Sequence, residues 1–293
     1  MFHSSRRAHC ELPHERHHNL RRFSRVGQVT VLISLVFAGV TVSDAGAATG
    51  APRAVSLNGP YGLALNSKGD VFVADTSNNR VVEITPKGVE TVIGSGFHDP
   101  EGVVVNPAGD VFVADSLNNR VVEVTPKGKQ TTFGSKLHQP EGIAINSTGD
   151  LFVADTLNNR VVKITPRDRQ TTVIRGFSDP FGVAVNSKGD LFVTSRVNNR
   201  VVEVSPKGKQ TAVGSGFSGS EGVGLDTKGD VFVADPFNDA VVKVTSAGAM
   251  TKVGHGFSYP SGVVVNSSGD VFVADLGPNR IVEVWPKGAQ SVL

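Results

Sequence analysis

The residues best suited to chemistry in this sequence are three glutamates that recur at multiples of forty positions. Glu101, Glu141 and Glu221 each stand directly before a glycine. Carboxylate oxygens are good ligands for a cation when the fold brings several of them together. Charged residues on a solvated rim are the alternative interpretation, because exposed glutamates are common. The spacing therefore predicts a carboxylate cluster only if these three positions meet in space.

Three histidines form the second candidate set. His98 and His138 occupy equivalent positions forty residues apart, whereas His255 stands three residues earlier than the repeat requires. Three imidazoles can hold a catalytic zinc ion. Solvated loop histidines are the alternative, and we expect that alternative, with no metal and no other cofactor.

Other reactive groups are scarce. The single cysteine is Cys10, no G-x-S-x-G motif is present, and no glycine-rich loop of the phosphate-binding kind occurs. We therefore assign no catalytic residue and expect a protein that is not an enzyme.

The candidate residues belong to a repeat of forty residues. A Gly-Asp pair occurs six times, and Asn-Asn-Arg or a variant of it follows each pair. The aspartates of these pairs are Asp70, Asp110, Asp150, Asp190, Asp230 and Asp270. Within one copy, residues 62–65, 70–74, 80–84 and 90–93 are short runs rich in β-branched and apolar residues, separated by turn sequences. In one turn Gly69 is expected to be left-handed, and in the next Pro86 and Gly88 supply the φ angles. Each copy is thus predicted to be a four-stranded antiparallel meander.

Such a meander has apolar side chains on both faces and needs a neighbour on each side. Radial stacking supplies these neighbours, and closing the ring removes exposed ends. The sequence therefore predicts an all-β, six-bladed β-propeller, with an open β-solenoid as the less favoured rival. One phenylalanine per copy is expected to pack between blades, at Phe72, Phe112, Phe152, Phe192, Phe232 and Phe272. The ring could close with residues 289–293 or with residues 53–57, and the sequence leaves both open.

The repeated Pro-x-Gly and Gly-Asp-Val-Phe-Val-Ala-Asp-Thr-x-Asn-Asn-Arg-Val-Val segments resemble the NHL repeat over residues 59–293. The likeness extends to the extracellular six-bladed sensor domain of mycobacterial serine/threonine kinases, although no kinase domain is present here. The resemblance implies a propeller that binds proteins, peptides or other ligands on one face. Some related propellers are enzymes, namely the zinc-dependent amidating lyases and the streptogramin lyases. The other residues of the amidating lyases' zinc site find no match here, so a metal-dependent lyase is the alternative function.

Residues 1–47 do not follow the repeat. A basic stretch, an apolar run over 29–42 and Ala45-Gly46-Ala47 are typical of a secretory signal peptide, with an uncleaved membrane anchor as the alternative. We expect cleavage after Ala47, a linker over residues 48–58, the propeller over residues 59–293, and a secreted or cell-envelope location. The part after residue 47 carries 23 basic and 24 acidic residues, which gives no basic face for nucleic acid. It also lacks cysteine, which excludes a disulfide framework.

The positions where the copies differ are the best candidates for a binding site, because repeat residues that are not needed to stabilise the fold can vary. The residue between Pro and Gly is expected near the mouth of the central channel, and the loop after the second strand is expected on the same face. Exposed apolar residues there, such as Leu117, Leu157, Phe181 and Phe237, favour recognition over neutral drift. The predicted ligand-binding residues are Tyr61, Glu101, Glu141, Phe181, Arg196, Glu221 and Phe237. The expected partner is an unidentified protein, peptide or envelope ligand bound by a monomer.

Overall fold

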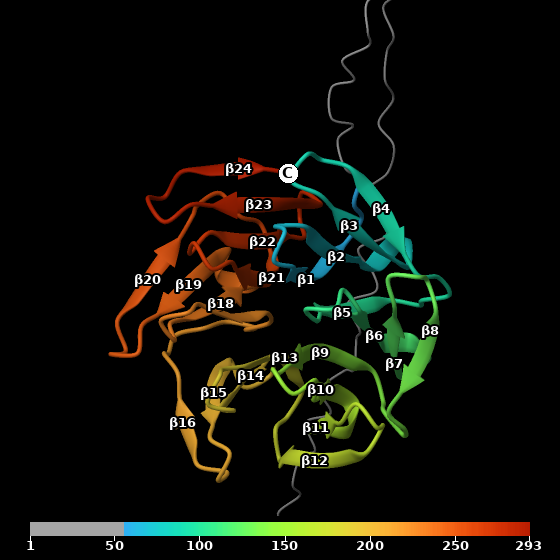
Figure 1. Ribbon diagram of the computed structural model, residues 1–293. Coiled ribbons are helices and arrows are strands. Elements are labelled where there is room, and N and C mark those ends of the chain that lie inside the picture. The colour runs from blue at the N-terminus through green and yellow to red at the C-terminus, as the bar shows by residue number, and fades with distance from the viewer. Residues whose placement is uncertain (1–55) are drawn as a thin grey trace, which may run out of the picture. The chain divides into compact units, whose positions relative to one another are not determined.

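The computed structural model describes residues 56–293, and the predicted signal peptide lies outside the described residues. Six four-stranded antiparallel sheets are arranged as blades in a ring, so the predicted six-bladed β-propeller is confirmed (Figure 1). Helical structure in the described part of the chain is confined to four 3₁₀ turns. These are η1 (Thr76–Asn78), η2 (Ser116–Asn118), η3 (Thr156–Asn158) and η4 (Pro236–Asn238). Within residues 56–293 no helix is both long and apolar enough to span a membrane.

Each blade is a meander in which sequence neighbours pair. Blade 1 consists of β1 (Pro60–Leu65), β2 (Val71–Asp75), β3 (Arg80–Ile84) and β4 (Glu90–Ile93). Blade 2 consists of β5 (Pro100–Val105), β6 (Val111–Asp115), β7 (Arg120–Val124) and β8 (Gln130–Phe133). Blade 3 consists of β9 (Pro140–Ile145), β10 (Leu151–Asp155), β11 (Arg160–Ile164) and β12 (Gln170–Arg175).

The remaining blades follow the same order. Blade 4 consists of β13 (Pro180–Val185), β14 (Leu191–Ser195), β15 (Arg200–Val204) and β16 (Gln210–Ala212). Blade 5 consists of β17 (Val223–Leu225), β18 (Val231–Asp235), β19 (Ala240–Val244) and β20 (Met250–Val253). Blade 6 consists of β21 (Pro260–Val265), β22 (Val271–Asp275), β23 (Arg280–Val284) and β24 (Gln290–Val292).

The sixth blade is completed by β24, its own last strand, which answers the question of ring closure that the sequence left open. The joint between the last and first blades is direct, because the Ser261 hydroxyl donates to the carbonyl of Pro60 at 2.9 Å. Leu57 is buried in the apolar cluster that joins these two blades.

The phenylalanines pack between blades as predicted. Phe72 of blade 1 lies with Val111, Val113 and Val122 of blade 2, and Phe272 of blade 6 lies with residues of blade 1. All six are buried, with 3–7% of their surface exposed. The core is therefore six similar apolar layers between blades, each stabilised by burial of about 1.5–3 kcal/mol per large side chain.

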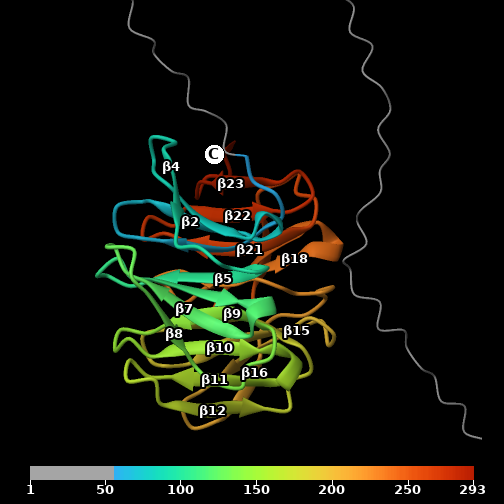
Figure 2. The same ribbon diagram turned by 90° about the vertical axis from the view of Figure 1, so that its right-hand side faces the viewer.

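Strand register separates the turns onto two faces. Pro60 pairs with Asp75 and Asp75 with Arg80, so the inner-strand start and the loop between second and third strands share one end of blade 1. The Gly-Asp and Pro-Lys-Gly hairpins lie at the other end, and Gly69 and Gly88 have φ of 83° and 74°, as expected. The side view shows the blades edge-on (Figure 2). We call the first end the mouth face and the second end the hairpin face.

The buried Asp75–Arg80 pair fixes the mouth-face loop. Asp75 accepts the Asn58 backbone N–H at 2.6 Å and the Arg80 Nε–H at 2.6 Å. The pair fixes this turn locally, and it is not a surface pair, because Asp75 has no exposed surface. Blade 4 replaces the aspartate with Ser195, and blade 5 replaces the arginine with Ala240, so both lose the pair.

Candidate functional site

Glycines at the start of the inner strands bring the candidate residues together. A Cβ added at Gly102 would overlap the carbonyl oxygen of Glu141 in the next blade, and one at Gly262 would overlap that of Tyr61 across the closing joint. The equivalent glycines of the other four blades show the same close approach. Only glycine permits backbones to approach this closely. The residue before each glycine is therefore held at the channel mouth; these six mouth residues are Tyr61, Glu101, Glu141, Phe181, Glu221 and Ser261.

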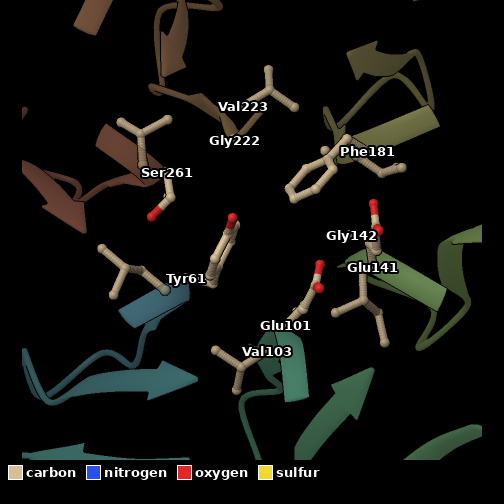
Figure 3. Close-up of a pocket in the computed structure, with 17 residues that line it drawn as sticks. Tyr61, Glu101, Val103, Glu141, Gly142, Phe181, Gly222, Val223 and Ser261 are labelled. Atoms are coloured by element: carbon tan, nitrogen blue, oxygen red, sulfur yellow. The ribbon is translucent and has the colours of Figure 1, made fainter. Parts of the chain in front are cut away.

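A cavity of about 70 Å³ lies inside this ring of mouth residues. Five of the six line the cavity. The sixth, Glu221, does not line it, although the next residue, Gly222, does. Valines and other small apolar residues of the inner strands form the deeper wall (Figure 3). A typical pocket for a drug-sized ligand measures about 300–1,000 Å³. This cavity can therefore take a small chemical group, not a whole drug-sized molecule.

Two aromatic rings divide the mouth. Tyr61 belongs to blade 1 and Phe181 to blade 4, which stand opposite each other in a ring of six, yet their ring centroids are only 6.0 Å apart. Both rings point toward the centre in Figure 3, with the side chains of Glu101 and Glu141 together on one side of them. Glu221 and Ser261 come from blades 5 and 6, on the other side. The mouth therefore has two unlike halves.

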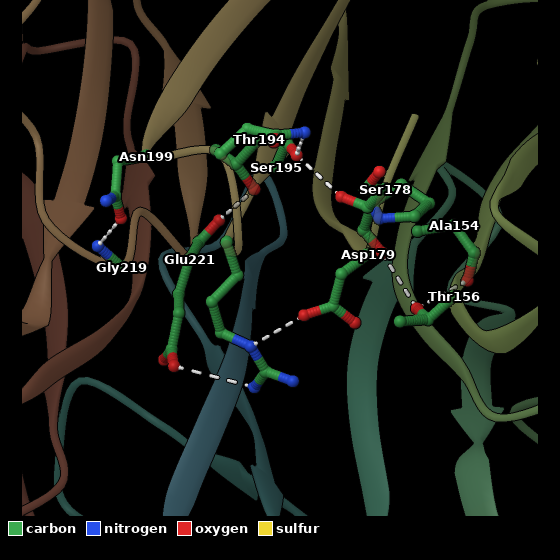
Figure 4. A network of polar contacts seen from close by, with 12 residues as sticks. Ala154, Thr156, Ser178, Asp179, Thr194, Ser195, Asn199, Gly219 and Glu221 are labelled. Carbon is green, nitrogen blue, oxygen red and sulfur yellow. Dashed lines mark hydrogen bonds and ion pairs between the residues drawn. The ribbon is translucent and has the colours of Figure 1, made fainter. Parts of the chain in front are cut away.

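The blade 5 side is occupied by a charged network centred on Arg196 (Figure 4). The Arg196 Nε lies 3.1 Å from Oδ2 of Asp179, and its Nη1 lies 3.8 Å from Oε1 of Glu221. The guanidinium also covers Phe181, with 4.8 Å from its central carbon to the ring centroid. The Tyr259 hydroxyl donates to the same Glu221 oxygen at 3.3 Å. Arg196 is thus already paired within the protein.

A buried threonine stabilises this network through two hydrogen bonds. Thr194 has no exposed surface. Its hydroxyl donates to the carbonyl of Glu221 at 2.6 Å and accepts the N–H of Gly182 at 2.7 Å. Both groups belong to mouth segments of neighbouring blades. The five other copies have alanine at this position. The hydroxyl bridge between neighbouring blades that Thr194 forms is therefore specific to blades 4 and 5.

The three glutamates are buried more than a solvated rim would allow. Glu221 has no exposed surface and Glu141 has 8%, while Glu101 is partly buried. One oxygen of each, Oε2, is buried without a hydrogen-bond partner among the described residues. Unpartnered buried carboxylate oxygens are unfavourable, because a charge loses its hydration there. The alternative of exposed rim charges is therefore wrong, and the structure forms a buried acidic cluster.

Burial controls the ionisation of this cluster. Loss of hydration raises the pKa of Glu141 to about 8, against the lowering effect of nearby Arg196. Burial likewise raises the pKa of Glu221 to about 8, again opposed by Arg196. Burial and then the adjacent Glu141 carboxylate raise the pKa of Glu101 well above its usual range. Near neutral pH the unliganded cluster therefore retains protons.

The structure brings six of the seven predicted ligand-binding residues into one assembly. These are Tyr61, Glu101, Glu141, Phe181, Arg196 and Glu221. The seventh, Phe237, is 57% exposed and stacks edge-on against Tyr259, at 5.5 Å between ring centroids. It therefore reaches the cluster only indirectly, through Tyr259 and Glu221.

Two expectations about exposure are wrong. Phe181 was expected at an exposed loop tip, but it is 5% exposed because Arg196 covers it. The loop after the second strand was expected to form a surface free for binding. In blades 1 to 3 its first residue is instead a buried hydroxyl that donates to a carbonyl of the next blade, from Thr76, Ser116 and Thr156 to Pro100, Pro140 and Pro180. Arg196 takes this position in blade 4.

Three members of the site were missed by reasoning from sequence: Asp179, Thr194 and Tyr259. Thr194 carried a readable signal, as the one departure from alanine among six copies. One other copy also has aspartate at the position of Asp179, namely Asp99, and nothing in the sequence marks Asp179 as the partner of Arg196. Tyr259 precedes the mouth residue of blade 6 by two positions and reaches sideways into blade 5.

The histidines lie away from the mouth cavity. His98, His138 and His255 are exposed, and none lines the cavity. In the described part of the chain, no three His, Cys, Asp or Glu side chains are grouped so that they could hold one metal ion.

Comparison with known proteins relates this architecture to lyases. The profile of the virginiamycin B lyase family matches residues 48–292. A streptogramin B lyase structure is 16% identical, with a TM-score of 0.62, and the match covers 82% of this chain and 84% of that one. A catalytically inactive histidine-to-alanine variant of virginiamycin B lyase from Staphylococcus aureus, solved with quinupristin, is 19% identical at a TM-score of 0.61 and 80% and 83% coverage.

Other propellers match equally well in shape. A putative gluconolactonase is 16% identical with a TM-score of 0.62, and the match covers 74% of this chain and 85% of that one. These low identities establish a shared fold and no shared site. The comparison with curated proteins found no match.

Proposed function

This chain belongs to the virginiamycin B lyase family, and we propose that it is a non-catalytic member that binds a ligand at the mouth face. The observation that carries the proposal is the convergence of the variable mouth residues on one cavity whose buried carboxylates have unpartnered oxygens. Proteins retain such unfavourable groups at functional sites, where a ligand supplies the missing partner. The hairpin face, with lysines repeated at its turns, is a solvated surface in this proposal.

The family match favours a second candidate, a metal-dependent lyase. In the S. aureus enzyme, a variant with one histidine replaced by alanine is catalytically inactive. Here the described histidines are exposed and lie outside the cavity, and the described side chains offer no three-ligand group for a metal. The cavity is also lined by carboxylic acids that hold protons, which suit binding better than proton abstraction at neutral pH. These features support a binding role.

Turnover separates the two candidates. We expect the full chain, incubated with quinupristin and magnesium chloride, to leave the cyclic peptide intact by mass spectrometry. The S. aureus enzyme serves as the positive control. Linear product that accumulates with enzyme concentration would establish the lyase instead.

Ligand binding is tested by a thermal-shift screen of small molecules and peptides. We expect at least one compound class to raise the melting temperature of the wild-type chain. The double variant R196A/F237A should abolish that shift, because it alters both the mouth network and the exposed aromatic beside it. K127A/K207A, on the hairpin face, is the matched control and should retain the shift. Equal shifts in both variants would place binding elsewhere.

The remaining parts of the proposal concern context. We propose that the chain is exported by its N-terminal segment, acts as a monomer and recognises a peptide, protein or envelope ligand. The NHL-repeat assignment and the likeness to kinase sensor domains stay predictions from sequence. N-terminal sequencing of the protein from its native host would test export, with cleavage expected after Ala47.

A further inference from the structure

One half of the mouth holds a pair of acidic side chains from adjacent blades, Glu101 and Glu141. Within residues 56–293, Oε2 of Glu101 and Oε2 of Glu141 are buried and have no hydrogen-bond partner. Both side chains line the cavity, and the Glu141 carboxyl lies close enough to raise the pKa of Glu101. In Figure 3 their side chains lie together on one side of the Tyr61 and Phe181 rings. The pair therefore presents two buried oxygens to which no described group donates a hydrogen bond.

The nearest cation of the site is committed elsewhere. Arg196 pairs with Asp179 and Glu221 and stacks on Phe181. Arg196 lies near enough to Glu141 to lower the pKa of that carboxyl, but within residues 56–293 it forms no ion pair with Glu101 or Glu141. The buried Oε2 atoms of the two glutamates receive no hydrogen bond from any described residue.

We propose that the Glu101–Glu141 pair binds the primary ammonium group of an organic ligand, with the aromatic ring of Tyr61 as one wall. This inference rests on the proposed binding function and names its ligand class. A primary ammonium carries three N–H donors and no acceptor, which matches a pair of acceptor-only carboxylates. An aromatic face beside the acids adds cation–π attraction.

Two arguments decide against other cations, and the cavity volume limits how much of the ligand can enter. A divalent metal needs several ligands at about 2–2.6 Å, and the described His, Cys, Asp and Glu side chains form no three-ligand group. A quaternary ammonium has no N–H, so it would leave the carboxylate oxygens unpartnered. The cavity of about 70 Å³ admits a head group and the first carbons of its chain, so the rest of the ligand extends over the mouth face.

Binding should be coupled to proton release. The acids of the empty site hold protons near neutral pH, and an ammonium ion pairs best with their ionised forms. Affinity should therefore rise as pH increases from 6 toward 8, while the amine itself stays protonated. The charged and titratable groups that act on this pair are Tyr61, Asp99, Asp179, Arg196 and Glu221.

The test is isothermal titration calorimetry on the full chain with four probes, three of which have an aliphatic chain and differ in head group. These are n-pentylamine, pentyltrimethylammonium, pentanoate and magnesium chloride, at pH 7.5 in two buffers of different ionisation enthalpy. We expect saturable one-to-one binding of n-pentylamine, at least tenfold weaker binding of the trimethyl analogue, and none of pentanoate or magnesium. The apparent enthalpy should differ between buffers by the equivalent of about one released proton.

Variants localise the effect. E101Q/E141Q keeps shape and removes both ionisable groups, so n-pentylamine affinity should fall at least tenfold and buffer dependence should vanish. E203Q, a partly buried glutamate on β15, is the control and should bind like wild type. Equal affinity for the primary and quaternary amines, or full affinity in E101Q/E141Q, would overturn the proposal. If no amine binds while the thermal-shift screen yields another mouth-face ligand, the ammonium inference fails and the binding function stands.

Discussion

Burial of acidic groups at the mouth should make the protein less stable as pH rises, and Glu141 is the clearest case. Its carboxyl is buried, and its pKa rises from 4.5 to about 8 on folding because of lost hydration. Between these values the native state keeps a proton that the unfolded chain releases. The contribution of Glu141 to stability is therefore fully present below about pH 4.5, declines through the window from 4.5 to 8, and levels off above it.

The structure sets the size of this effect. A shift of 3.5 pKa units at 1.36 kcal/mol per unit corresponds to up to about 5 kcal/mol lost across the window. Glu141→Gln removes this loss, since glutamine is neutral at every pH and nearly isosteric. At pH 9 the variant should be more stable than wild type by about 2–5 kcal/mol, which corresponds to a melting temperature higher by at least about 4 °C. At pH 4.5 the two proteins should be nearly equal.

The assay is thermal or urea unfolding of the wild type and Glu141→Gln at half-unit steps from pH 4.5 to 9. The variant-minus-wild-type difference isolates this group from the other titrations of the chain. Glu203→Gln, treated identically, is the matched control at a glutamate outside the mouth. A flat curve for Glu141→Gln, or a variant that is less stable at pH 9, would show that the Glu141 carboxyl ionises without cost, and the reasoning from burial would be refuted.

Three further predictions concern the scaffold of the mouth. Gly142→Ala places a Cβ against the Phe181 carbonyl and should lower the free energy of unfolding by at least about 2–3 kcal/mol, measured by urea unfolding. The control Gly216→Ala, where φ is 78° and the space is open, should lower it by only about 1 kcal/mol. Equal losses would contradict the close-approach argument. Thr194→Val should cost about 1–3 kcal/mol, because it leaves the N–H of Gly182 and a carbonyl unpaired, whereas the exposed Thr132→Val should be neutral within about 0.5 kcal/mol. Phe152→Ala should cost about 3–5 kcal/mol by creating a cavity between blades 3 and 4, and a loss below 1 kcal/mol would argue against interblade packing.

Repetition made the scaffold readable from sequence alone. Six copies of one meander pattern have apolar side chains on both faces, and this burial requirement has few solutions besides a closed ring. Phe72 and its five equivalents could be assigned to the interblade core because a large apolar side chain recurring in phase must meet the same environment each time. The turn glycines, such as Gly69, were readable because few other residues adopt a positive φ at low cost.

The mouth was readable only as a set of positions. Tyr61, Glu101, Glu141, Phe181 and Glu221 stood out because they differ where the repeat is otherwise constant. Their side chains, however, contact residues from other blades, and these contacts depend on distances across the ring. Local sequence carries no information on such distances.

Tertiary structure therefore decided the character of the site. Tyr61 of blade 1 and Phe181 of blade 4 reach across the channel and divide the mouth, and Arg196 covers Phe181 while pairing with Asp179 and Glu221. Glutamates that appear from sequence to be solvated rim charges become buried acids, since neighbouring blades exclude water from them. The sequence by itself determined the ring and the positions that face its mouth. Only the packing of adjacent blades and the contacts across the channel determined which of these residues are exposed, which are paired, and which have buried oxygens without a partner among the described residues.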